Sequence, residues 1–88
     1  MRLDFNSARE LALKFLLEQE AKFGGVPCSI VESRIVENER GWYFPYQSVE
    51  FLATGDINAS LVGNWPIFVS GDGLYVGPGR PDIKERGG

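Results

Sequence analysis

The order of the predicted elements restricts the fold more than any other feature of the sequence. One amphipathic helical segment comes first, and strands joined by short turns follow it. Between residues 8 and 22 the apolar side chains recur with the 3.6-residue period of one helix face. Ser7 and Glu10 fit a capping box, in which each side chain bonds the backbone amide of the other residue. The glycine pair at 24–25 can end a helix in the left-handed conformation, and Pro27 cannot continue one. We therefore predict an amphipathic helix over about residues 8–22.

The middle of the chain has the pattern of a β-hairpin. Apolar and polar residues alternate in the segment that begins at Cys28, and a polar loop at 37–41 separates it from the aromatic segment 42–47. Pro45 has no amide hydrogen, so its position indicates an edge strand or a bulge. Alternation along the aromatic segment also predicts that consecutive side chains lie on opposite faces of the sheet.

A second hairpin follows after a short helical turn. Asp56 is placed to cap that turn, which is expected to extend through Leu61. The segments 67–69 and 74–76 then flank the turn 70–73, whose glycines accept positive φ at no steric cost. The sequence therefore predicts four strands in total.

Strands joined by hairpins are antiparallel, because parallel neighbours need long crossover connections that this chain lacks. We predict an α+β fold in which one N-terminal amphipathic helix packs on one face of a four-stranded antiparallel sheet. The 88 residues fit one domain, assigned to 1–80, and the segment 81–88 is expected to be a flexible tail because glycine and charge dominate it. The opposite sheet face would then be open for contact with another protein.

The composition argues against most catalytic chemistry. The sequence has no histidine, which removes the usual proton-transfer residue and the Cys-His and Ser-His nucleophile pairs. Cys28 is the only cysteine and is expected to be a small buried apolar residue, so zinc sites built from Cys and His are excluded. We predict that the protein is not an enzyme and binds no cofactor or metal ion.

The charge and hydropathy patterns limit the partners. The net charge of −3 supplies no basic patch that would neutralise nucleic-acid phosphates. No apolar run approaches the roughly 20 residues of a membrane-spanning helix, and no secretory signal is evident at the N-terminus. We therefore expect a cytoplasmic protein, monomeric or homodimeric, that binds neither nucleic acid nor membranes.

Aromatic and acidic residues are the candidates for contact with a partner protein. Tyrosine and tryptophan are enriched at protein interfaces, although core packing is the alternative for any single aromatic residue. Carboxylates around such anchors would steer a basic partner, although ordinary solubility explains the same charge. The predicted partner-binding residues are Tyr43, Trp65 and Tyr75, placed on the open face or in loops, together with Glu32, Glu37, Glu39 and Glu50.

Several short segments, in this order and at this spacing, resemble the YrhB-like family, also classified as the immunity protein 35 family. They are Gly41-Trp42-Tyr43-Phe44, Glu50-Phe51-Leu52, Thr54-Gly55-Asp56, Leu61-Val62-Gly63-Asn64-Trp65-Pro66-Ile67 and the turn Gly71-Asp72-Gly73. The resemblance covers about residues 5–80. It implies a bacterial α+β protein that binds and neutralises a cognate toxin of a polymorphic toxin system. The alternative that it implies is a chaperone-like holdase of the YrhB type, and neither role brings a catalytic motif to this chain.

Overall fold

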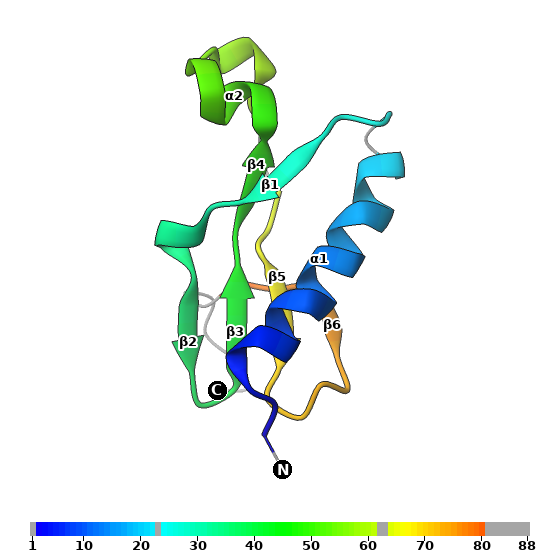
Figure 1. Ribbon diagram of the computed structural model, residues 1–88, viewed down its shortest axis with the longest axis vertical. Helices are drawn as coiled ribbons and strands as arrows, with labels where there is room; N and C mark the ends of the chain where they lie inside the picture. Colours follow the sequence, from blue (N-terminus) through cyan, green and yellow to red (C-terminus); the bar gives the residue numbers. More distant parts are fainter. Residues whose placement is uncertain (1, 23, 62–63, 81–88) are drawn as a thin grey trace.

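The computed structural model describes residues 2–22, 24–61 and 64–80, and in them one long helix packs on an antiparallel sheet (Figure 1). The sheet has four strands in the order β2-β3-β5-β6, and β1 pairs with β4 in a separate two-stranded sheet. The predicted α+β class and the helix-on-sheet arrangement are confirmed. The element bounds are α1 Phe5–Lys22, β1 Cys28–Ile30, η1 Glu32–Arg34, β2 Val36–Asn38, β3 Gly41–Phe44, β4 Tyr46–Ser48, α2 Val49–Thr54, η2 Ile57–Ala59, β5 Ile67–Ser70 and β6 Val76–Pro78, where η denotes a 3-10 helix.

Helix α1 begins earlier than the predicted capping box. The Ser7 amide donates to Oδ1 of Asp4 at 2.7 Å, so Asp4 caps the helix and Ser7 lies within its first turn. The earlier start brings the Phe5 ring to within 5.9 Å of the Phe44 ring, measured between centroids, which adds apolar contact to the first turn. The predicted end is confirmed, since the glycines at 24–25 have φ angles of 77° and 83°.

The core lies between α1 and the sheet. Ala8 and Ala12 are fully buried, and their small side chains let the helix backbone approach the strands closely. Leu16 continues the same helix face and is also buried. The other buried members of this core are Ile30, Trp42, Phe44, Tyr46, Ile67 and Val69.

Both strands of the first predicted hairpin are interrupted near their centres. The segment that begins at Cys28 forms β1, then η1, then β2, whereas the prediction had one continuous strand. On the opposite side Pro45 separates β3 from β4, which agrees with the predicted disruption at that residue. The Val31 amide still donates to the Pro45 carbonyl at 2.8 Å and holds the two interruptions side by side.

A compact unit of α2 and η2 lies at the end of the molecule away from the start of α1 (Figure 1). Helix α2 was not among the predicted elements. Its N-cap is Ser48, whose hydroxyl accepts a hydrogen bond from the Phe51 amide at 3.0 Å, and Gly55 ends it with a φ of 75°. The predicted cap of the following turn is confirmed, since Oδ1 of Asp56 accepts from the Asn58 amide at 3.0 Å.

The last strand is displaced from its predicted position. The prediction placed it at 74–76, whereas β6 begins at Val76. The Asp72 carboxylate accepts from the Leu74 amide at 3.0 Å and from the Ser70 hydroxyl at 2.7 Å, which extends the turn by two residues. The predicted tail 81–88 lies outside the described residues.

Candidate protein-binding surface

The predicted anchor Tyr43 lies on the expected sheet face but is buried. It alternates along β3 with Trp42 and Phe44, which face α1, so its ring lies on the opposite face. That ring packs against Phe68 with centroids 4.7 Å apart, and only 5% of Tyr43 is exposed. Its placement as an accessible anchor is therefore wrong, because Phe68 on β5 covers a side chain that alternation alone leaves open.

The two other aromatic candidates are exposed. Tyr75 is 48% exposed, its ring lies 5.9 Å from Phe68, and its hydroxyl donates to the Pro78 carbonyl at 3.1 Å. Trp65 is 42% exposed and the Arg80 guanidinium lies over its ring, 5.6 Å from the centroid. Both side chains are accessible to a partner, and their role in binding stays a prediction.

The four acidic candidates do not form one cluster. Glu32 forms an ion pair with Arg9 of α1, and the hydrogen bond from that guanidinium lowers the pKa of Glu32 below its usual value. Glu37 pairs with Arg2 at 3.4 Å. Glu39 lies in the turn between β2 and β3, and Glu50 lies on α2. These four carboxylates are thus distributed over η1, β2, a turn and α2, and steering by them stays a prediction.

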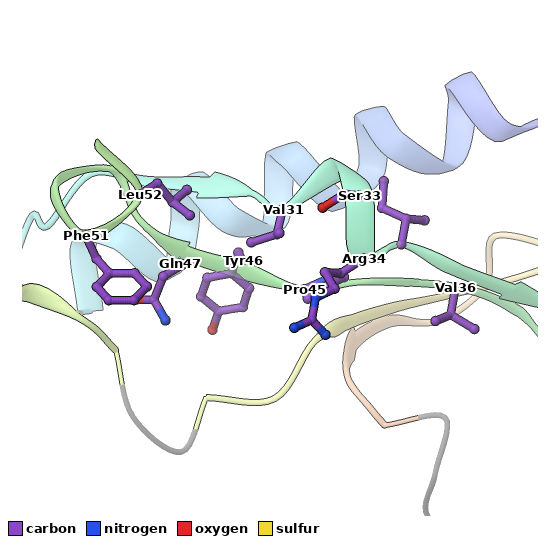
Figure 2. A pocket seen from close by; sticks show the side chains of 10 residues that line it. Val31, Ser33, Arg34, Val36, Pro45, Tyr46, Gln47, Phe51 and Leu52 are labelled. Atoms are coloured by element: carbon purple, nitrogen blue, oxygen red, sulfur yellow. The ribbon is translucent and has the colours of Figure 1, made fainter. Parts of the chain in front are cut away.

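A groove of about 660 Å³, which the sequence did not predict, lies beside the interrupted hairpin. It lies beside η1 and Pro45, where both strands are interrupted, and Phe51 and Leu52 of α2 line one end of it (Figure 2). Figure 2 shows the side chains of Phe51, Gln47, Tyr46 and Arg34 on one side of the ribbon of β4 and η1. The residues that line this groove are Val31, Ser33, Arg34, Ile35, Val36, Pro45, Tyr46, Gln47, Phe51 and Leu52.

The polar side chains of the groove are unequally available. Gln47 is occupied, because its amide nitrogen donates to the Leu61 carbonyl at 3.2 Å and its oxygen accepts from the Ser48 amide at 2.9 Å. Burial raises the pKa of the Tyr46 phenol, with a smaller contribution from Cys28, so this side chain stays neutral at ordinary pH. Arg34 is exposed and is the one charged residue among the ten that line the groove.

Cys28, at the start of β1, is half-buried. Burial raises the pKa of the Cys28 thiol, with a smaller contribution from the Glu20 charge, so the protonated and less nucleophilic form is favoured. Among the residues that the structure describes, no group of three or more Cys, Asp or Glu side chains is placed to hold a metal ion. In the same part of the chain no helix is long and apolar enough to cross a membrane.

The chain is similar to known proteins over about half to most of its length. The chain is 48% identical over 45 residues to the "Uncharacterized protein YrhB" of Escherichia coli (strain K12), and this match covers 48% of each protein. The chain thus spans about half the length of this curated relative. No solved structure matches the chain significantly. Residues 6–76, from the first turn of α1 to the start of β6, match the family described as Immunity protein 35, as the sequence resemblance predicted. The chain belongs to the Immunity protein 35 family.

Proposed function

We propose that this protein binds a cognate bacterial toxin in a fixed ratio and neutralises it inside the producing cell. The observation that carries the proposal is the match of residues 6–76 to an immunity-protein family. An immunity protein acts by occupying a folded toxin, so it needs a preformed surface and no catalytic group of its own.

The surface around α2 is suited to such contact. Four large apolar side chains near this helix and the adjoining groove are exposed: Val36, Val49, Leu52 and Ile57. Exposed apolar side chains weaken a monomer's contact with water, whereas the core of a protein interface uses such side chains. The hydrogen bond from the Ser48 hydroxyl to the Ala59 carbonyl, 2.6 Å long, holds η2 against the start of α2 and gives this surface a fixed shape.

The same proposal assigns the protein no catalytic activity and a cytoplasmic location. The absence of histidine from the sequence and the raised pKa of the Cys28 thiol support a non-enzymatic role. A screen of the purified chain against ester, peptide, phosphate and glycoside substrates tests this part. Reproducible turnover that vanishes when one carboxylate is replaced, with the fold intact, would show the protein to be an enzyme.

Binding is tested with a toxin encoded beside the gene for this chain. Co-expression is expected to restore growth of bacteria that carry the toxin, and titration calorimetry is expected to show saturable binding with a fixed stoichiometry. Binding without neutralisation would reject the immunity role.

The chaperone-like alternative makes the opposite prediction in the same experiments. A holdase recognises apolar surface on many unfolded proteins and has no fixed stoichiometry with one folded partner. Suppression of aggregation for several unrelated denatured proteins, without saturable toxin binding, would therefore favour the holdase role.

A further inference from the structure

We propose that the groove between η1, Pro45 and α2 binds an extended segment of the partner toxin, in which a carboxylate lies between apolar side chains. This inference rests on the proposed function and specifies the site and the chemistry of the bound segment. It differs from the sequence-based expectation of a basic partner attracted by scattered glutamates.

The groove is large enough for several side chains of a peptide, and its lining suits apolar ones. Its volume of about 660 Å³ holds a few apolar side chains, and its walls are mainly aliphatic and aromatic. Leu52 at one end and Val36 at the other are both exposed, so a bound segment would remove apolar surface from water along the whole groove.

Arg34 gives the groove its charge preference. Within the described parts of the chain this guanidinium has no hydrogen bond or ion pair, whereas Arg2 and Arg9 each contact a carboxylate. A guanidinium next to apolar walls binds a carboxylate more strongly than one surrounded by water, because the groove lowers the local dielectric. The sign of the charge at this site is therefore opposite to the net charge of −3 of the whole chain.

The Arg9–Glu32 ion pair ties η1, the turn that carries Arg34, to α1. Both glutamate oxygens accept from the Arg9 guanidinium, which holds the first residue of η1 against α1. Two residues later in this single turn, the Arg34 side chain lies beside Pro45, on the side of η1 away from the adjacent turns of α1 (Figure 2). The guanidinium is thus presented by a turn that is tied to the core helix.

The adjacent strand favours an extended polypeptide over a small molecule. β2 is an edge of the four-stranded sheet, with β3 on its inner side. An edge strand offers unpaired backbone N–H and C=O groups to a segment that lies alongside it. Val36 belongs to this edge strand and also lines the groove, so one extended segment can use both.

The test selects binders to the full chain from a displayed library of random peptides about 12 residues long. The selected peptides are expected to carry Asp or Glu between apolar residues. Arg34→Glu is expected to raise their Kd at least about tenfold, since hydrogen bonds between charged groups contribute that much. The control variant Lys14→Glu makes the same change of net charge at an exposed position of α1, and its Kd should stay within about twofold of the wild-type value.

Two further comparisons separate charge from shape. Replacing the peptide carboxylate by its amide isostere should weaken binding to the wild-type protein. The same replacement should change the affinity for the Arg34→Gln variant little, because both changes remove the same interaction. Leu52→Asp should weaken binding, whereas Leu17→Asp, at an exposed position on α1, should not. Circular dichroism of each variant confirms that the fold is kept.

The outcomes are decisive for the groove independently of the toxin. Failure to select any peptide, or peptides that ignore both Arg34→Glu and Leu52→Asp, would overturn the proposal. Sedimentation that shows a dimer broken by Leu52→Asp would assign the groove to a second copy of the chain and would also overturn it. If the protein neutralises a toxin and Arg34→Glu leaves the Kd for that toxin unchanged, the groove is not the binding site but the proposed function stands. If peptides bind the groove but no toxin is neutralised, the groove stands as a binding site and the proposed function is rejected.

Discussion

The rings of Tyr43 and Phe68 face each other across β3 and β5 with their centroids 4.7 Å apart. Tyr75 extends this contact, since its own ring lies 5.9 Å from Phe68. The sheet face away from α1 therefore carries a packed aromatic row, in which one end is buried and the other end is exposed. Burial of Tyr43 makes it part of the folded core, and exposure leaves Tyr75 available to a partner.

This difference in burial predicts different effects for two of the proposed anchors. Tyr43→Ala should lower the free energy of unfolding by roughly 2 to 5 kcal/mol, because it empties a buried aromatic site. Trp65→Ala, at an exposed position, should cost less than about 1 kcal/mol in stability and weaken toxin binding if Trp65 lies in the interface. Urea unfolding and calorimetry measure the two effects. Equal losses of unfolding free energy for Tyr43→Ala and Trp65→Ala would contradict the assignment of Tyr43 to the core and of Trp65 to the surface.

Alternation along β3 was sufficient to predict the face of Tyr43 but not its burial. The face depends on the local strand geometry alone, whereas the cover comes from Phe68 on a strand that is distant in the sequence. The same limit applies to the groove, whose two interruptions are local features. Their alignment follows from the pairing of Ile30 with Tyr46 and of Val36 with Tyr43, which no single segment encodes.

Helix α2 was missed for a different reason. Its six residues are too few to show a 3.6-residue period, so the usual signal for an amphipathic helix is absent. The signal that was present is the pair of ends, with Ser48 as an N-cap and Gly55 in the left-handed conformation. Capping residues at a spacing of seven are weaker evidence than periodicity, but here they mark both ends of the helix.

Substitution of the helix face tests the core. Leu16 is 2% exposed and Leu17, the next residue, is 66% exposed. Leu16→Ala should therefore cost about 2 to 5 kcal/mol of unfolding free energy, whereas Leu17→Ala should change it by less than about 0.5 kcal/mol. Urea unfolding of both variants gives the comparison. A loss below about 1 kcal/mol for Leu16→Ala would contradict the assigned helix face.

Acid should weaken the N-terminal cap of α1. Hydrogen bonds from the Ser7 amide, and secondarily from its hydroxyl, lower the pKa of Asp4 in the folded state. The cap therefore stabilises the fold fully above the ordinary carboxyl pKa of about 4, and this stabilisation is lost as the pH falls through the lowered value. Asp4→Asn keeps a capping acceptor without a titrating group, so it should lose less thermal stability than the wild type between neutral pH and about pH 2. Melting curves at both pH values measure this. An identical acid response of the two proteins would show that Asp4 does not contribute.

The close approach of β3 and β5 at Gly41 makes the last prediction. A Cβ atom on this residue would lie 2.1 Å from the Val69 carbonyl oxygen, and its φ of 153° is one that other residues rarely adopt. Gly41→Ala should therefore lower the free energy of unfolding by roughly 3 kcal/mol or more, because backbone atoms, not a flexible side chain, must move. Gly25→Ala is the matched control, since its φ is also positive at 83° but no atom beyond its two chain neighbours lies within 4 Å of the added methyl group. It should cost only about 1 to 2 kcal/mol, the conformational part alone. Urea unfolding of both variants gives the steric contribution as the difference between their losses of unfolding free energy. Equal losses would mean that the two strands shift apart without cost and that the contact at Gly41 does not constrain the sheet.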